Sequence, residues 1–132
     1  MTELAFSGLG LNPMTASPPN VNDNGAVSGG SSSGAATSVA FGLAAAGIGS
    51  DTGGSVRAPA AWNDLVGLKT RSGRLSLTGV VPLCARFDTV GPLCRSTEDA
   101  AHLLAAMETG RAGRSPKAIS FADLRLCVLE TS

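Results

Sequence analysis

The most continuous hydrophobic pattern in the chain covers residues 35–46. Ala, Val, Phe and Leu fill nearly every position of this segment, with interruptions at Thr37, Ser38 and Gly42. Apolar residues on most sides at helical spacing predict a helix that is buried on most of its faces. Gly47 follows the apolar run directly and predicts the end of that helix.

Shorter patterns downstream predict strands. Residues 65–68 are an apolar run of strand length, and residues 74–77 and 79–83 alternate weakly around a glycine turn. We therefore expect three short strands in this part of the chain. Residues 124–129 predict one more strand, at the edge of a sheet whose other partners are absent.

A second, amphipathic helix is predicted to begin at Ser96. Ser96 followed by Asp99 resembles a capping box, with Asp in place of Glu or Gln. One face of the helix is apolar and consists of Ala100, Leu103, Leu104 and Met107. His102 falls on the opposite face, so we expect it to face solvent, and Gly110 predicts the end of the helix.

Two loops rich in glycine and serine flank the first helix. The earlier loop, Gly29–Gly34, offers three serine hydroxyls, and the later one, Gly49–Ser55, is too rich in glycine for a strand interior. The later loop can point successive N–H groups at one spot. Such a nest beside the Ser55 hydroxyl would stabilise an oxyanion, at roughly 3–4 kcal/mol per donor in enzymes. A tight structural turn is an equal alternative from these residues alone.

Composition limits the classes of partner. The 132 residues carry ten basic and ten acidic side chains, so no strongly charged face indicates a nucleic acid or an anionic membrane. Three cysteines without a CxxC pair or a signal peptide indicate reduced thiols and a cytoplasmic protein. With a single histidine we expect no metal site, and no apolar run is long enough to span a membrane.

Four motifs occur in a fixed order: GGSSSG, SDTGGSVR, VGLK and FDTVGPL. Together they resemble the amidase signature family, whose hydrolases and amide-transferring subunits use a Ser–Ser–Lys triad. The resemblance implies an α/β fold with a mixed β-sheet flanked by helices. It also implies hydrolysis of a carboxamide C–N bond other than a peptide bond, in a small-molecule substrate, without metal or organic cofactor.

The same resemblance implies roles for individual residues. Ser55 matches the nucleophile that forms the acyl-enzyme, and Ser31 matches the serine that relays its proton. The peptide bond between Gly30 and Ser31 is expected to be cis. The implied oxyanion hole consists of the backbone N–H groups of Thr52, Gly53, Gly54 and Ser55. Structural support of the site is expected from Asp51, Arg57, Gly30 and Ser32.

The triad lysine has no counterpart among the two lysines of this chain. Lys69 matches a downstream family position, and Lys117 follows a connector of Gly, Arg, Ser and Pro over residues 110–116. A serine hydroxyl at its ordinary pKa is a poor nucleophile without a base. We therefore expect residues 1–132 to be the central part of a single amidase domain, without its N-terminal lysine region and C-terminal half. The isolated chain is then expected to be inactive.

Other functions stay open at this point. A catalytically inactive amidase-like fragment, or a binding protein that depends on a partner, would explain the missing lysine. An A-type subunit of a glutamyl-tRNA amidotransferase would use the same pair of serines. A homodimer is an open alternative for the full-length protein.

Two short motifs suggest other classes of hydrolase. Residues 30–34 satisfy GxSxG, and Ser32, Asp88 and His102 follow the chain order of an α/β-hydrolase triad. The segment before this motif, however, cannot form the hydrophobic strand that such an elbow requires. Residues 51–53 spell the DTG of aspartic proteases, but a helix precedes them and no second copy exists. Asp88 is more simply interpreted as a turn or cap carboxylate.

Overall fold

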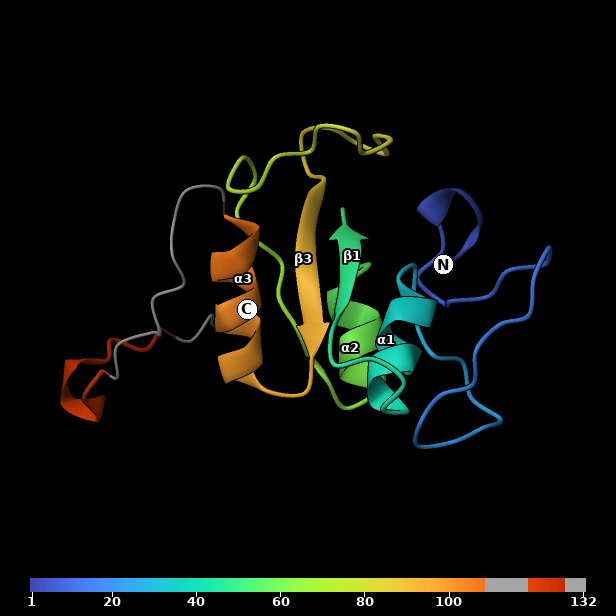
Figure 1. Ribbon diagram of the computed structural model, residues 1–132, viewed down its shortest axis with the longest axis horizontal. Helices are drawn as coiled ribbons and strands as arrows, with labels where there is room; N and C mark the ends of the chain where they lie inside the picture. Colours follow the sequence, from blue (N-terminus) through green and yellow to red (C-terminus); the bar gives the residue numbers. More distant parts are fainter. Residues whose placement is uncertain (109–118, 128–132) are drawn as a thin grey trace, which may run out of the picture.

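The computed structural model describes residues 1–108 and 119–127, and these form a small antiparallel sheet with helices at its sides (Figure 1). The sheet has three strands in the order β1-β3-β2. In chain order the elements are the 3-10 turn η1 (Glu3–Ala5), α1 (Ser33–Ala40), β1 (Gly47–Asp51), α2 (Arg57–Trp62), β2 (Val66–Gly67), β3 (Thr89–Cys94), α3 (Thr97–Met107) and the 3-10 turn η2 (Phe121–Asp123). The predicted α/β fold is confirmed, and the described strands pair antiparallel.

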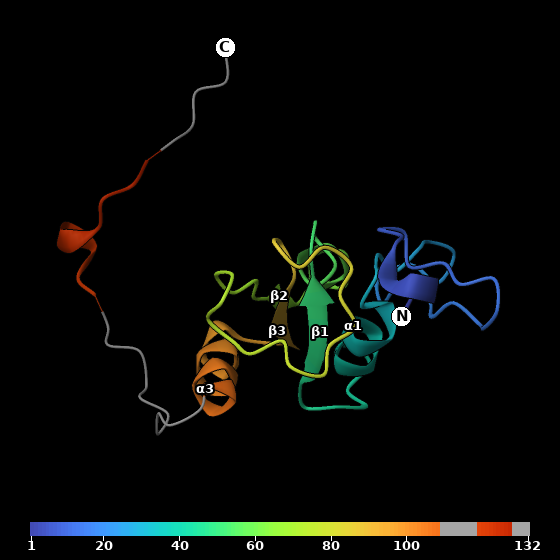
Figure 2. The same cartoon turned by 90° about the horizontal axis from the view of Figure 1, so that it is seen from above.

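Strand β3 lies at the centre of the fold. It pairs with all of β1 on one side and with β2 on the other. The buried core joins β3 to α1 and α2 through the small or medium side chains of Ala36, Val56, Ala60 and Leu93. Helix α1 contacts β1, and α3 contacts β3 from the opposite side of the strands (Figures 1 and 2). Because β1 is held by both β3 and α1, the loop after Asp51 leaves from a rigid support.

Strand β3 contains Gly91 and Pro92, two residues that are unusual inside a sheet. Pro92 accepts a hydrogen bond from the Leu68 N–H at 3.0 Å but has no N–H to return. Strand β2 accordingly ends at Gly67. Glycine is required at position 91 because Leu68 lies close to β3: a Cβ there would lie 1.9 Å from the Leu68 carbonyl oxygen.

The helix predicted over residues 35–46 is shorter than its hydrophobic pattern. Helix α1 ends at Ala40, and Gly42 follows with a φ of 73°. This left-handed conformation closes the helix, because it turns the chain away from the helical path. The prediction that Gly47 ends the helix is therefore wrong: Gly47 begins β1.

The prediction that residues 49–55 are too rich in glycine for a strand is wrong for residues 49–51, which belong to β1, and is confirmed for residues 52–55. Strand β1 continues through Gly49 because it lies directly against the Gly–Ser loop. A Cβ at Gly49 would lie 2.4 Å from the Ser32 Oγ and 3.0 Å from the nearest methyl carbon of Val56. Glycine at this position permits close approach of three segments, rather than a flexible backbone.

Residues 71–88 form an irregular loop, so the strands predicted over residues 74–77 and 79–83 are wrong. Gly79 adopts a left-handed conformation with a φ of 84°. Backbone N–H groups of this loop donate to the carboxylate of Asp88 instead of to a neighbouring strand. The Asp88 carboxylate thus takes the place of a strand partner for the N–H groups of Leu83 and Cys84.

The other predicted strands have different outcomes. The strand expected over residues 65–68 is confirmed as β2, although it is shorter and only half-buried. The strand expected over residues 124–129 is wrong for residues 124–127, which are not extended in a sheet. The last two residues of that prediction, and the connector over residues 110–116, lie outside the described residues.

Helix α3 begins where the sequence predicts. The Ser96 Oγ accepts a hydrogen bond from the Asp99 N–H at 3.0 Å, as in an N-cap. His102 is exposed as expected, and its Nε2 lies 3.8 Å from a Glu98 carboxylate oxygen. The predicted end at Gly110 lies outside the described residues. None of the helices in residues 1–108 and 119–127 is long and apolar enough to cross a membrane.

We expect Gly91→Ala to lower the free energy of unfolding by about 2 kcal/mol or more, because the new Cβ forces Leu68 away from β3. Gly8→Ala is the matched control, since nothing lies within 4 Å of a Cβ at Gly8. Its effect should stay within about 0.5 kcal/mol. Urea unfolding followed by circular dichroism measures both variants, and equal midpoints would contradict the close contact at Gly91.

Candidate active site

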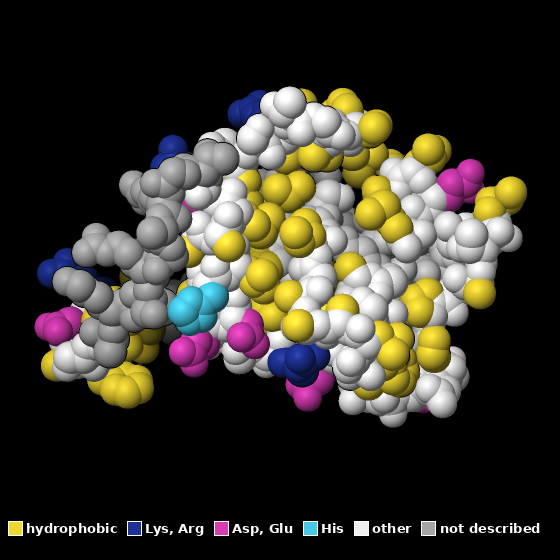
Figure 3. All heavy atoms as spheres, viewed as in Figure 1, with side chains coloured by type: hydrophobic (Ala, Val, Ile, Leu, Met, Phe, Trp, Pro, Cys, Tyr) yellow, Lys and Arg dark blue, Asp and Glu magenta, His cyan; other side chains and the backbone are white. Residues whose placement is uncertain are grey.

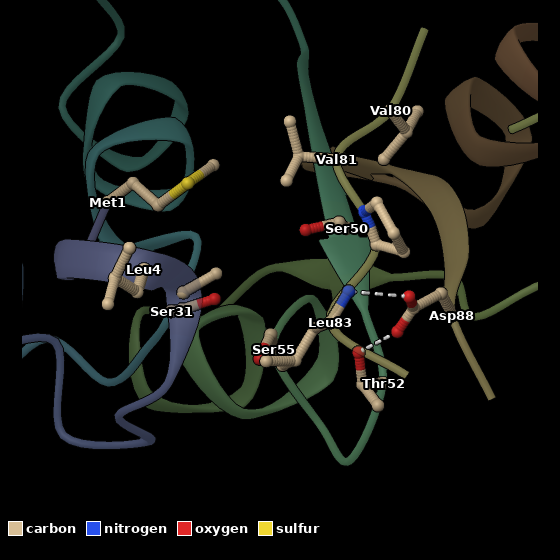
Figure 4. Close-up of a pocket in the computed structure, with 12 residues that line it drawn as sticks. Met1, Leu4, Ser31, Ser50, Thr52, Ser55, Val80, Val81, Leu83 and Asp88 are labelled. Carbon is tan, nitrogen blue, oxygen red and sulfur yellow. Dashed lines mark hydrogen bonds between the residues drawn. The ribbon is translucent and has the colours of Figure 1, made fainter. Parts of the chain in front are cut away.

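A cavity of about 500 Å³ brings together the two serines that the sequence singled out (Figure 4). Ser31 comes from the Gly–Ser segment before α1, and Ser55 comes from the turn before α2. Ser50 at the end of β1 and Thr52 just after it add two further hydroxyls to the lining. Figure 4 shows Ser31 and Ser55 near each other at one side of the cavity.

Ser31 is positioned by its backbone. The Gly30–Ser31 peptide bond is cis, as the resemblance implied. The Gly30 N–H donates to the Gly8 carbonyl at 2.8 Å, and the Ser31 carbonyl accepts from the Thr2 N–H at 3.1 Å. The Ser31 side chain is fully buried, and its Oγ has no hydrogen-bond partner among the described residues. The Ser28 and Ser33 Oγ atoms are unpaired as well, but of these three serines only Ser31 lines this cavity. Because an unpaired buried hydroxyl is costly, we expect the Ser31 Oγ to pair with a group at the cavity that these residues do not include.

Ser32 ties the two serine loops together. Its N–H donates to the Ser55 carbonyl at 3.1 Å, and its Oγ lies 3.4 Å from the Ser50 carbonyl oxygen. These contacts hold the segment that carries Ser31 against the segment that carries Ser55. The Ser32 hydroxyl is thereby occupied by the backbone.

Asp51 organises the loop that carries Ser55. Its side chain is fully buried at the end of β1. It accepts hydrogen bonds from the backbone N–H groups of Gly54, Val56 and Arg57. The Arg57 side chain adds Nε at 3.0 Å and Nη2 at 3.1 Å. The residues on both sides of Ser55 are therefore hydrogen-bonded to one carboxylate.

The partners of Asp51 keep it ionised. Burial by itself raises the pKa of Asp51, but the Arg57 guanidinium, the N–H groups of Val56 and Arg57 and the charge of Lys69 outweigh burial. The net pKa lies well below its usual value. An aspartic-protease role does not fit, because the active pair of that class must share a proton.

Lys69 supports the same carboxylate from another side. Its Nζ lies 3.3 Å from Asp51 Oδ1. It also donates to the backbone carbonyls of Asp51 and Phe87 and to the Thr89 hydroxyl. An ammonium has three N–H donors, and acceptors for all three are present here. Lys69 thus braces the loop and is not free to act as a base at Ser31.

Asp88 joins the Ser55 loop to the loop of residues 71–88. Its carboxylate accepts hydrogen bonds from the Thr52 hydroxyl and from the N–H groups of Leu83 and Cys84. The interpretation of Asp88 as a turn carboxylate is confirmed. The Thr52 bond lowers the pKa of Asp88, burial opposes it, and the two N–H groups lower it further, so the net pKa lies below its usual value.

The N–H groups around Ser55 fall into two sets. The Gly54 N–H donates to Asp51 at 2.8 Å, so this N–H group is not available to the expected oxyanion hole. Those of Thr52, Gly53 and Ser55 take part in none of the hydrogen bonds of the described chain. The same three residues line a second cavity of about 260 Å³, and Thr52 and Ser55 line both cavities. Unused donors at such a place can stabilise a developing negative charge.

The alternative Ser–Asp–His triad is not assembled. Ser32 contacts the Ser50 carbonyl, Asp88 is bound to Thr52 and to loop N–H groups, and His102 is exposed on α3. Within residues 1–108 and 119–127, no three His, Cys, Asp or Glu side chains gather as metal ligands.

Sequence reasoning missed the apolar wall of the large cavity and the bracing role of Lys69. The wall consists of Met1, Leu4, Ala5, Val80, Val81, Pro82 and Leu83. These residues come from two loops whose meeting no local pattern shows. The VGLK motif contained the signal for Lys69, since a lysine that follows an apolar run closely and is largely buried needs acceptors near the sheet.

The sequence model of the family named Amidase matches residues 1–124, and the chain belongs to this family. The chain is 47% identical over 107 residues to the A-type subunit of glutamyl-tRNA(Gln) amidotransferase from Chlorobium limicola, covering 81% of the chain and 23% of that protein. It is 43% identical over 129 residues to 2-amino-5-chloromuconic acid deaminase of Comamonas testosteroni, covering 96% of the chain and 28% of that protein.

Solved structures show the same relationship. The native peptide amidase of Stenotrophomonas maltophilia is similar with a TM-score of 0.78 at 36% identity, over 87% of this chain and 27% of that one. This chain therefore spans about a quarter of the length of the relatives that it matches.

We expect Asp51→Asn to lower the free energy of unfolding by about 2 kcal/mol or more at pH 7, because Arg57 and Lys69 lose an ionised partner. The folded pKa of Asp51 lies below the unfolded value of about 3.9. Its contribution is therefore complete above about pH 4 and is lost as the pH falls further. Urea unfolding should show the difference from the parent shrinking below about pH 4. Exposed Asp23→Asn is the control, and a difference independent of pH would contradict the ion pairing.

We expect Asp88→Ala to expose the N–H groups of Leu83 and Cys84, because their acceptor is removed. Their amide hydrogen exchange, measured by NMR, should become at least about ten-fold faster. Asp88→Asn keeps one acceptor oxygen and should give a smaller increase. Unchanged exchange in the alanine variant would show that Asp88 does not hold this loop.

Proposed function

We propose that this chain carries the two catalytic serines of an amide hydrolase, with Ser55 as the nucleophile that forms an acyl-enzyme. The main support is one cavity lined by Ser31 and Ser55, next to the unused N–H groups of Thr52, Gly53 and Ser55. Membership of the Amidase family supports a carboxamide C–N bond as the bond that is cleaved.

In this mechanism the Ser55 Oγ attacks the carbonyl carbon and passes its proton to Ser31. The carbonyl oxygen gains negative charge next to the unused N–H groups. The C–N bond then breaks, the amine leaves with a proton returned through Ser31, and the acyl group remains as an ester on Ser55. Water adds to this ester and releases the acid. The proposal involves no metal or organic cofactor.

Ser31 requires a base that takes and returns this proton. Lys69 is bound beneath the loop, whereas the Ser31 Oγ is buried without a partner in the described part of the chain. We propose that a lysine of the full-length protein, outside residues 1–132, completes the triad. Residues 1–132 would then be the central part of one amidase domain and inactive in isolation, in keeping with their coverage of the relatives.

A second candidate is the A-type component of an amidotransferase, in which the same serines release ammonia for transfer. The identity of 47% to the A-type subunit of glutamyl-tRNA(Gln) amidotransferase favours it. The two functions differ in what the protein does alone. A hydrolase should cleave simple amides without partner subunits, whereas an amidotransferase component should need them.

We expect Ser55→Ala in the intact protein to lower kcat/KM for amide hydrolysis by about 10⁴-fold or more, because no other group can carry the acyl ester. Ser31→Ala should also cause a steep loss, and exposed Ser72→Ala should keep parent activity. A fluorophosphonate that reacts with activated serines should add its mass to the Ser55 peptide of the parent only.

The outcomes separate the assignments. Turnover retained by Ser55→Ala would overturn its role as nucleophile. A mild effect of Ser31→Ala would overturn the proton relay. An intact parent with neither turnover nor adduct would favour an inactive, amidase-like binding protein.

A further inference from the structure

We propose that the large cavity selects amides whose acyl group is uncharged and apolar. This inference rests on the proposed function, since it takes Ser55 as the nucleophile. It concerns the chemistry of the wall that faces the serines, which the serine motifs do not determine.

Two loops that are distant in sequence form this wall. Met1 and Leu4 belong to the N-terminal segment, and Val80, Val81 and Leu83 belong to the loop of residues 71–88. Figure 4 shows Met1 and Leu4 on one side of the cavity and Val80 and Val81 on the other. An alkyl or aryl group between them would remove apolar surface from water on both sides.

Charged groups of a substrate would find no partner there. No Lys, Arg or His of the described residues lines the cavity. Among the side chains of this lining Asp88 carries a charge, and its oxygens already accept from Thr52, Leu83 and Cys84. On the face drawn in Figure 3, hydrophobic side chains gather near the middle and several charged ones lie toward the edge. A charged acyl group would gain no ion pair from the lining side chains, whereas an apolar group would cover the exposed side chains of Leu4 and Val81.

The two cavities define an orientation for the substrate. Gly53 and Ser55, with unused N–H groups, line the smaller cavity of about 260 Å³. The carbonyl oxygen would point toward these donors when its carbon lies at the Ser55 Oγ. The acyl chain then extends into the larger cavity, against Leu4, Val81 and Leu83.

The test compares three amides on the intact protein. 5-Methylhexanamide and glutaramate have the same shape, but an isopropyl group in the first replaces the carboxylate of the second. 5-Aminopentanamide places an ammonium at a similar distance from the amide. We expect kcat/KM for 5-methylhexanamide to exceed that of either charged amide by at least about ten-fold.

A charge introduced into the wall should change this preference. Val81→Lys should raise the ratio of kcat/KM for glutaramate over 5-methylhexanamide by about ten-fold, because the new ammonium pairs with the carboxylate. Leu43→Lys is the matched control and should leave the ratio unchanged. Leu43 does not line the cavity, and the two side chains are similarly exposed, at 82% for Leu43 and 89% for Val81.

The results distinguish this inference from the proposed function. Hydrolysis that depends on Ser55 but uses a charged amide as well as 5-methylhexanamide, or equal ratios in the two lysine variants, would overturn the inference alone. Turnover that persists in Ser55→Ala, or no turnover of any of the three amides together with no fluorophosphonate adduct, would overturn both.

Discussion

The carboxylate of Asp51 is fully buried, and the position of Ser55 depends on it. A buried ionised group is tolerated only when its charge and its lone pairs have partners. Arg57 and Lys69 supply the charge, and N–H groups from the turn around Ser55 supply hydrogen bonds. The turn therefore has one low-energy arrangement, because any other leaves the carboxylate unpaired. Because the buried carboxylate needs these partners, the position of the candidate nucleophile Ser55 is fixed.

Close backbone approach is the second constraint on the site. Gly30 and Gly49 have no room for a Cβ: backbone atoms of Ser7 and Gly10 lie against Gly30, and side-chain atoms of Ser32 and Val56 lie against Gly49. This approach allows Ser32 to bond to the Ser55 carbonyl and so joins the two loops. The Ser32 hydroxyl donates to a backbone carbonyl and has a structural role. The Ser31 hydroxyl is buried and has no hydrogen-bond partner among the described residues.

Asp88 connects the apolar wall of the cavity to the loop that carries Ser55. Through Thr52 it contacts the Ser55 loop, and through the N–H groups of Leu83 and Cys84 it holds the apolar wall of the cavity. Asp88 therefore contacts both the loop that forms the wall and the loop that would carry the acyl group. In the proposed mechanism the candidate oxyanion donors would bind the carbonyl oxygen, and the wall would contact the acyl chain.

The sequence by itself determined the α/β class, the cap of α3 at Ser96 and the two serine segments, because caps and glycine-rich turns are set by neighbouring residues. It failed wherever contacts between distant segments decide the outcome. The end of α1 at Ala40, the strand through Gly49 and the loop in place of two strands before Asp88 all depend on which segment lies opposite. Only the tertiary structure assigned Lys69 to Asp51 and removed the Gly54 N–H from the oxyanion donors, since hydrogen-bond partners are chosen by distance in space.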